Sequence, residues 1–345
     1  MSGKVGPQSA LRLRDRASRE ADEEQLSPLA TRSAASKGRA RPERDDDFRT
    51  AFERDRDRIL HSKAFRRLKH KTQVFINPEG DHYVTRLTHA LQVMQVARSL
   101  AVSLGLNESL AEAIALGHDC GHTPFGHTGE EALDAILDGG WHHAAQGVRI
   151  FERLEDANLT WEVRDGIRAH TWAIQPPPAT PEGMIVRFAD RIAYLSHDAQ
   201  DALRADMLEP SDFPAGVRRA LGAPGREWID QMIRSVVERS LAVGEVAMDP
   251  ALLEVMDELR AFMFERVYLS PGNEARKGAA LQIVTQLVDY HLEHPDELPD
   301  TYRDPDADVT RRVVDFVAGM TDRYALRLHD SLFRPVLFTE PRQAL

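Results

Sequence analysis

Apolar positions along most of the chain recur with the spacing of an α-helix. Residues 83–104 carry two apolar stripes on different faces, so we expect this helix to be buried on most sides. Residues 108–119 repeat the helical pattern, with Leu110, Ile114 and His118 one turn apart. Because segments with strand-like alternation are nearly absent, the sequence predicts an all-α fold.

Start signals mark two of the expected helices. Thr180, Pro181 and Glu182 combine a cap, a first-turn proline and a favourable charge, and predict a helix that runs to about residue 205. The aspartates at 45–47 also suit a helix start, where negative charge meets exposed N–H groups. Further helices are expected at about 226–243, 250–268, 274–293 and 308–326.

The N-terminal segment, residues 1–44, differs from the rest of the chain. It is rich in Arg, Ser, Ala and Glu and has few large apolar side chains. Such a segment buries too little surface to offset its ordering entropy, so we expect an arm that is mobile or is ordered by a partner. The formal net charge of residues 1–58 is +2, whereas that of residues 59–345 is −13. A weak nucleic-acid contact through this basic region is therefore an expectation too.

Composition excludes several classes of protein. The chain has 345 residues, 42% of them hydrophobic, which is enough for a sizeable core. The net charge of −11 argues against a protein that coats polyanions over a broad face. A single cysteine, Cys120, cannot form an intrachain disulfide. No apolar run is long enough to span a membrane and no secretory signal is apparent, so we expect a cytoplasmic protein without membrane contact.

Histidines concentrate in one quarter of the chain. Nine of the 14 lie between His61 and His143, which indicates one site rather than scattered surface positions. Residues 116–130 read LGHDCGHTPFGHTGE and place five ionisable side chains in 13 residues. Imidazole and carboxylate ligands together suit Mn, Fe or Zn, or Mg where oxygen dominates.

A metal site needs more ligands than His118 and Asp119. Adjacent residues on a helix point about 100° apart, so these two can bind one ion only if the helix ends or bends there, which Gly121 permits. His89 and Asp190 both occupy inward positions of predicted helices, where an unpaired polar or charged group is costly. A shared metal would satisfy all four side chains.

The ordered set His89, His118-Asp119 and Asp190 resembles the H…HD…D signature of HD-domain phosphohydrolases. Several stretches resemble the deoxynucleoside triphosphate triphosphohydrolases, the dGTPase-like branch. They are RDRDRILHSKAFRRLKHKTQVF (54–75), TRLTHALQV (85–93), GHDCGHTPFGHTGEEAL (117–133), WHHAAQG (141–147) and FADRIAYLSHD (188–198). The resemblance covers roughly residues 45–205 and implies an HD-domain helical bundle. We expect this domain to extend over residues 45–300, with a C-terminal helical extension, residues 301–345, on the same core.

The resemblance implies water attack on the α-phosphorus of a dNTP (dGTP or another), which yields a deoxynucleoside and inorganic triphosphate. It implies a divalent ion, Mn²⁺ or Mg²⁺ with Fe or Co as alternatives, held by the four residues above, and a homo-oligomer. By similarity His127 is the acid that protonates the leaving 5′-oxygen, and Glu130 orients it. His122 and His143 contact phosphate or the bridging region, and the Ala-Ala-Gln-Gly that follows favours His143 over His142.

Substrate contacts follow from the same resemblance. Arg86 and Arg191 are expected to bind phosphate. Gln73, Tyr194 and Asp198 are expected at the sugar, where Val74 would reject ribose sterically.

Two other functions fit parts of the sequence. One is an HD phosphohydrolase that cleaves a monophosphate, a cyclic nucleotide or a pyrophosphorylated alarmone. Arg86 and Arg191, with the expected sugar contacts, argue against it. The other is a nucleic-acid-binding or regulatory protein that uses the arginine-rich N-terminal segment and residues 54–71. The negative charge of the remaining chain weakens this alternative, and it leaves the metal ligands without a role.

Overall fold

The fold is built from α-helices, as the apolar periodicity predicts. The computed structural model describes residues 12–73, 84–268 and 271–334. Those residues contain 15 α-helices and no β-strand, only two isolated bridges. In chain order the helices are α1 (Arg16–Asp22), α2 (Ala51–His61), α3 (Lys63–Arg67), α4 (Arg86–Leu104), α5 (Glu108–Gly117), α6 (His127–Asp134), α7 (His143–Arg149), α8 (Trp161–Ala169), α9 (Pro181–Arg204), α10 (Ala215–Leu221), α11 (Arg226–Val243), α12 (Pro250–Met263), α13 (Pro271–Glu293), α14 (Val309–Ala318) and α15 (Asp322–Phe333).

Short 3₁₀ or π segments join or extend several of these helices. They are η1 (Glu23–Gln25), η2 (Ser33–Ala35), η3 (Leu68–His70), η4 (Ile150–Leu154), η5 (Phe264–Tyr268), η6 (Pro295–Glu297) and η7 (Asp300–Tyr302). Within the described ranges no helix is both long and apolar enough to cross a bilayer.

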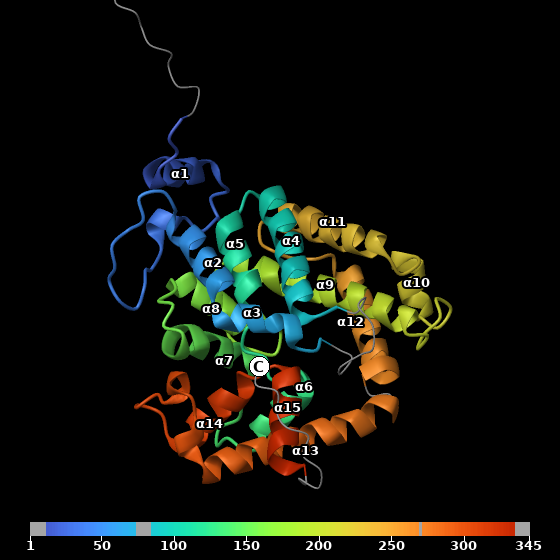
Figure 1. Cartoon of the computed structure of the whole chain (residues 1–345). Coiled ribbons are helices and arrows are strands. Elements are labelled where there is room, and N and C mark those ends of the chain that lie inside the picture. The colour runs from blue at the N-terminus through green and yellow to red at the C-terminus, as the bar shows by residue number, and fades with distance from the viewer. Residues whose placement is uncertain (1–11, 74–83, 269–270, 335–345) are drawn as a thin grey trace, which may run out of the picture.

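A bundle of long helices forms the larger part of the molecule. Helices α4, α5 and α9 pack against one another, and α2 and α8 cover α5 (Figure 1). One face of α4 is buried, with Val93, Val96, Ala97 and Leu100 fully or almost fully inaccessible, whereas Leu91 and Val102 on the opposite side are exposed. The sequence prediction of burial on most sides is therefore wrong: the stripe through Val93, Val96 and Leu100 lies in the core, while the other stripe is only partly covered. The main apolar cluster of the described residues continues into α11 and α12.

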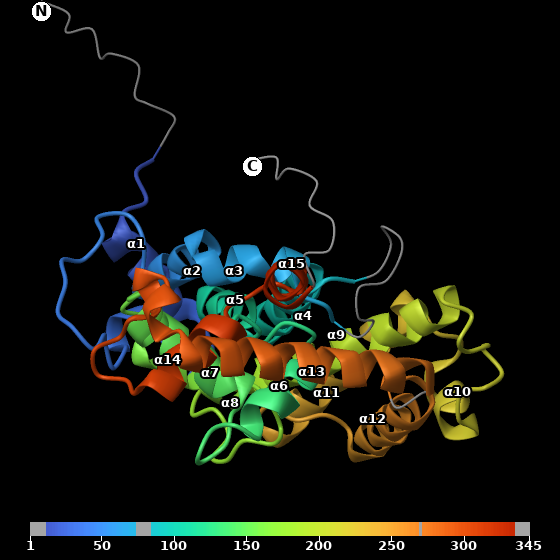
Figure 2. The same ribbon diagram turned by 60° about the horizontal axis from the view of Figure 1, so that its bottom comes forward.

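The C-terminal helices make a second apolar cluster. Side chains of α13, α14 and α15 pack there with Leu133 of α6 and with Phe125 and Trp141 beside it. Helix α6 contacts α13 along its length, and in Figures 1 and 2 the orange α13 runs past α6 at one side of the bundle. The second cluster therefore supports the loop and helix that carry His127 and Glu130.

Two boundaries differ from the sequence predictions. The first long helix begins at Ala51, because Thr50 and Glu53 form a reciprocal capping box. The side chain of Asp46 instead accepts hydrogen bonds from the backbone of a preceding turn. The helix expected at 308–326 is two helices, because Thr321 caps a new start at α15.

The described part of the N-terminal segment packs on the bundle of its own chain, whereas the sequence predicts an arm that is mobile or ordered by a partner. Of this segment the structure describes residues 12–44. Thr31 donates from its backbone N–H (2.9 Å) and its hydroxyl (2.7 Å) to the buried carboxylate of Glu182. The hydroxyl of Ser36 donates to buried Glu162 at 2.7 Å. Polar pairing with buried carboxylates thus holds a segment that has little apolar surface.

We expect Asp55→Ala to lower the free energy of unfolding by about 3–5 kcal/mol, the cost of leaving one partner of a buried ion pair alone. Asp55 is fully buried, pairs with Arg39 of the N-terminal segment and accepts two 2.7 Å hydrogen bonds from Thr160. Urea unfolding followed by circular dichroism measures the change. The matched control is Asp47→Ala at an exposed ion pair with Arg44, which should cost less than about 1 kcal/mol. Equal losses would show that Asp55 does not anchor the segment.

Candidate metal and phosphate site

Three helices bring four predicted metal ligands to one buried point. His89 lies on α4, Asp190 lies on α9, and His118 and Asp119 form the turn that follows α5. His89, His118 and Asp119 are almost completely inaccessible to solvent, and Asp190 is half-buried. Helix α5 ends at Gly117, and His118 is its C-cap, still in right-handed helical backbone conformation.

The ligand atoms lie close enough to share one ion. His89 Nε2 is 3.1 Å from Asp190 Oδ1, and His118 Nε2 is 3.8 Å from the same oxygen. Asp119 Oδ1 is 3.4 Å from His118 Nε2, and its Oδ2 is 3.9 Å from His89 Nε2. Ligand atoms of His89, His118 and Asp190 all lie within 4.8 Å of one another, as a common cation requires.

The hydrogen bonds of His118 fit a metal ligand. Its Nδ1 lies 2.6 Å from the carbonyl oxygen of Ala115, which requires the proton to be on Nδ1. The opposite nitrogen, Nε2, is buried and has no hydrogen-bond partner. Metal-binding histidines commonly donate one ring N–H to a backbone carbonyl and present the other nitrogen to the ion. The residues present therefore fit a divalent cation.

Both carboxylates of this cluster are held in the ionised form that a metal requires. Burial opposes ionisation of Asp190, but the hydrogen bond from His89 and the nearby His118 keep its pKa below the usual value. Burial likewise opposes ionisation of Asp119, yet His118 and Arg86 lower its pKa well below the usual range.

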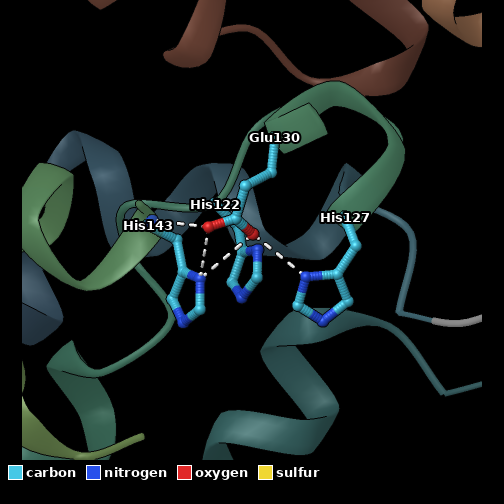
Figure 3. Close-up of side chains that lie close together, drawn as sticks. All are labelled: His122, His127, Glu130 and His143. Atoms are coloured by element: carbon cyan, nitrogen blue, oxygen red, sulfur yellow. Dashed lines mark hydrogen bonds and ion pairs between the residues drawn. The ribbon is translucent and has the colours of Figure 1, made fainter. Parts of the chain in front are cut away.

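A second group of side chains surrounds the carboxylate of Glu130 (Figure 3). Its oxygens lie 3.0 Å from Nδ1 of His127 and 3.0 Å from Nδ1 of His143. Burial opposes ionisation of Glu130, but the two imidazole hydrogen bonds lower its pKa far below the usual range. His127 is 74% exposed, whereas His143 and His122 are buried. Glu130 thus orients one solvent-facing and one buried imidazole.

The structure decides between the two adjacent histidines at the start of α7. His142 caps that helix by accepting from the N–H of Ala144, at 3.1 Å. His143 contacts Glu130 and stacks on the ring of His122, with the two centroids 3.8 Å apart. His143, and not His142, therefore contacts Glu130 and His122, and a catalytic role for it stays a prediction.

Two glycines in the loop between α5 and α6 are required by close approach. A Cβ on Gly121 would lie 2.0 Å from the carbonyl oxygen of His143 and 2.3 Å from the nitrogen of Gly147. Gly121 is thus needed for tight packing of α7 against the loop, not for the bend that the sequence analysis assigned to it. Gly126 has φ +60°, and a Cβ there would lie 3.0 Å from an Arg86 nitrogen.

The predicted phosphate cations occupy different surroundings. Arg86 is buried and donates from Nη1 to Asp119 Oδ2 at 2.9 Å, so it lies directly beside the metal ligands. Arg191 forms an ion pair with the exposed carboxylate of Asp257. Lys71 is also buried nearby: it donates to two backbone carbonyls, those of His122 and Ala318, and burial lowers its pKa to about 7.

The residues predicted to contact the sugar have separate surroundings. Asp198 is buried, accepts from the Tyr268 hydroxyl at 2.6 Å, and has its pKa raised to about 7 by burial. Tyr194 is half-buried against the main apolar cluster, and burial raises its pKa to about 12. The side-chain oxygen of Gln73 is buried without a hydrogen-bond partner. Val74 lies outside the described residues.

Two residues of this region escape the sequence analysis. His170, directly after α8, is buried with its Nε2 3.3 Å from Nε2 of His143. Burial and the neighbouring His118 and His143 lower the pKa of His170 to about 3. Tyr268 is the last residue of the helix expected at 250–268, and its hydroxyl donates to Asp198 at 2.6 Å. Neither residue belongs to a local motif, so only the packing of distant helices reveals them.

Asp322 ties the C-terminal helices to the loop that carries the site. It is the first residue of α15 and is buried. Its carboxylate accepts from the backbone N–H of Phe125 and of Thr72, both at 3.0 Å, and from the Thr72 hydroxyl. Phe125 has φ +62°, which non-glycine residues rarely adopt. The carboxylate thus stabilises a strained turn between His122 and His127.

The fold and the clustered histidines and carboxylates define an HD-domain phosphohydrolase. Residues 86–195 match the HD domain, and residues 246–331 match the phosphohydrolase-associated domain. The chain belongs to the family of deoxyguanosinetriphosphate triphosphohydrolase-like proteins, as its relatives show.

Three such relatives carry that name. One from Caldanaerobacter subterraneus subsp. tengcongensis is 49% identical over 90% of this chain and 93% of its own length. Another, from Desulfatibacillum aliphaticivorans, is 44% identical over 90% of this chain and 95% of its own length. A third, from Clostridium perfringens strain 13, is 43% identical over 90% of this chain and 94% of its own length. A solved hypothetical protein from Aquifex aeolicus shares 20% identity over 82% of this chain and 68% of its own, with a TM-score of 0.47.

Loss of the Asp322 carboxylate should loosen the loop it holds. A hydrogen bond to a charged group contributes about 1–3 kcal/mol, so we expect Asp322→Ala to speed amide exchange in the peptide covering residues 118–127 by about 5- to 150-fold. Hydrogen–deuterium exchange with mass spectrometry measures this. Asp330→Ala, at an exposed position on the same helix, is the control and should leave that peptide unchanged. Unchanged protection in both variants would show that Asp322 does not hold the loop.

Proposed function

We propose that the protein is a metal-dependent dNTP triphosphohydrolase that acts at the α-phosphorus and releases a deoxynucleoside and inorganic triphosphate. The observation that carries the proposal is the convergence of His89, His118, Asp119 and Asp190, with the buried Nε2 of His118 left without a partner. The relatives named for deoxyguanosinetriphosphate hydrolysis support the substrate class and make dGTP the first candidate.

The metal would be held by those four residues. A divalent ion bound there polarises a phosphoryl oxygen and lowers the pKa of water towards neutrality. Nitrogen and carboxylate ligands suit Mn²⁺, Fe or Co, and Mg²⁺ where oxygen ligands dominate. Arg86 donates to Asp119 and keeps this ligand ionised and oriented.

His127 is the group that protonates the departing 5′-oxygen. Its Nδ1 faces the ionised carboxylate of Glu130, so a protonated His127 has its Nε2–H free to donate. The side chain is exposed, which allows it to reach a bound substrate and to recover its proton from solvent. His122 faces Asp119 from the same loop, with its Nε2 3.1 Å from Asp119 Oδ1. It is placed to contact phosphate.

The triphosphate needs cations besides the metal. Arg86 lies at the metal ligands, and Arg191 follows Asp190 on α9. The carboxylate that pairs with Arg191, Asp257, is 62% exposed, so a phosphate can displace it without stranding a buried charge. Substrate binding would then exchange one anionic partner of Arg191 for another.

The sugar is assigned to the region around Asp198. This carboxylate lies on α9 two turns after Asp190, and Tyr194 lies between them, so the three residues share one helix face. Gln73 offers an unpaired amide oxygen. Val74, as the residue that would reject ribose, stays a prediction.

A different phosphohydrolase reaction is the principal alternative. The arginines beside the metal ligands favour a triphosphate over a monophosphate. A nucleic-acid-binding protein is less well supported, since arginines of the N-terminal segment form ion pairs with carboxylates: Arg14, Arg16, Arg19, Arg32, Arg39, Arg41 and Arg44. A weak nucleic-acid contact, a homo-oligomer and a cytoplasmic location remain predictions.

The products test the reaction directly. We expect the full-length protein, incubated with each of the four dNTPs and with Mn²⁺, Mg²⁺ or Co²⁺ in turn, to release inorganic triphosphate and deoxynucleoside in equal amounts. Anion-exchange chromatography identifies both products. Release of orthophosphate or pyrophosphate would instead indicate one of the other HD phosphohydrolase reactions.

If His127 is the general acid, its removal should lower the catalytic rate without weakening the binding of substrate or metal. His127→Ala should lower kcat by about 10²–10⁴, the usual contribution of a general acid, while metal content and KM change little. Steady-state kinetics and elemental analysis measure the two effects. His61→Ala, at an exposed end of α2, serves as the control and should retain full activity. A near-normal rate for His127→Ala would transfer the role of the acid to another group.

A further inference from the structure

The segment that follows α8 is held against α9 by one buried arginine. Arg187 of α9 donates from its guanidinium to three backbone carbonyls of residues 169–174, each at 2.7 Å. Trp172 lies within this segment, and its indole N–H donates back to the carbonyl oxygen of Arg187 at 3.3 Å. The indole is therefore fixed to the backbone of α9 one turn before Arg191.

The ring of Trp172 lies beside the guanidinium of Arg191. The Cζ of Arg191 is 5.7 Å from the ring centroid, within the range of a cation–π contact. Phe188 of α9 packs edge-to-face on the same indole, with the ring centroids 5.2 Å apart, so packing as well as a hydrogen bond holds the ring on this helix. Arg191 is buried, and a cation removed from water gains more from an aromatic ring than an exposed one does.

The guanidinium of Arg191 keeps some of its capacity for an anion. Its Nη2 pairs with Asp257 of α12, which lies on an exposed part of that helix. Its Nε is buried and has no hydrogen-bond partner among the described residues. If a phosphate replaces Asp257, the guanidinium must stay in place while its anionic partner changes. The contact with Trp172 does not involve the Asp257 carboxylate, so this exchange leaves it intact.

From this arrangement we infer that Trp172 is a positioning residue for the triphosphate, whose ring holds the guanidinium of Arg191 in place while a phosphate replaces the carboxylate of Asp257. The inference rests on the proposed function, because it takes Arg191 as a phosphate cation. Trp172 acts through Arg191. An interaction that is made equally in the ground state and in the transition state changes KM and leaves kcat unaltered.

Two substitutions of Trp172 separate the aromatic ring from the hydrogen bond. Trp172→Phe keeps an aromatic face and Trp172→Leu does not, while both remove the indole N–H that bonds to Arg187. Isothermal titration calorimetry with inorganic triphosphate, on the full-length protein with Mn²⁺ present, measures binding without turnover. We expect Trp172→Leu to bind inorganic triphosphate about 2- to 30-fold more weakly than Trp172→Phe, the range of a cation–π contact. With a dNTP as substrate, KM should differ by the same factor and kcat should be equal.

A double-mutant cycle shows whether the ring acts through Arg191. In the background of Arg191→Met, the two substitutions of Trp172 should bind inorganic triphosphate equally, because the cation that the ring holds is gone. The matched control is Trp161→Leu. The ring of Trp161 also has a cation over it, the Nζ of Lys37 at 3.5 Å, but it lies at the start of α8. This variant should bind inorganic triphosphate as tightly as the wild-type protein does.

Several outcomes would overturn the inference. They are equal binding by Trp172→Leu and Trp172→Phe, a difference between them that persists in Arg191→Met, and a wild-type protein that does not bind inorganic triphosphate. If Trp172→Leu fails to fold by circular dichroism, Trp172→Phe is compared with the wild-type protein in the same cycle, since indole is the stronger partner of a cation. Its loss of affinity must then be smaller in the background of Arg191→Met.

The two proposals can fail separately. Hydrolysis of a dNTP without release of triphosphate would refute the proposed reaction and leave the binding comparison standing, because inorganic triphosphate is bound without being cleaved. Release of triphosphate from a dNTP, with no difference between Trp172→Leu and Trp172→Phe, would do the reverse.

Discussion

The burial of several imidazoles and carboxylates at one point is the constraint on which the rest of the structure depends. An isolated charge in such a place is costly, and neither His118 nor Asp119 reaches solvent. Each carboxylate therefore has imidazoles or Arg86 beside it, and each imidazole has a carboxylate or a backbone carbonyl. Helices α4, α5 and α9 must pack in one register for these partners to meet.

The C-terminal helices extend this constraint beyond the HD domain. Asp322 of α15 holds the loop between His122 and His127, and buried Asp315 of α14 accepts from Gln146 and Arg149 of α7. Both contacts reach elements that carry site residues. The phosphohydrolase-associated domain thus acts as a support for the site, because its buried carboxylates satisfy N–H groups of the HD domain that would otherwise be unpaired.

The two groups of histidines have different surroundings and, in our proposals, different tasks. His127 is exposed and is oriented by Glu130, which suits a group that must exchange a proton with substrate and solvent. His143 shares the same carboxylate but is buried, and its remaining nitrogen faces His170. One carboxylate can therefore fix the tautomer of both rings, while only the ring of His127 is open to solvent.

The sequence by itself determined the helical class, because helix periodicity is a local property of the chain. It also predicted the grouping of His89, His118, Asp119 and Asp190, and its family resemblance predicted the pairing of His127 with Glu130; metal binding by the four residues stays a prediction. These four residues could be grouped although they lie far apart in the chain, since their order resembles a family signature. Tertiary structure alone decided that residues 12–44 pack on the bundle, that Lys71 is buried, and that His170 meets His143. Those contacts join residues distant in the chain, and only the packing of whole helices brings their polar groups within bonding distance.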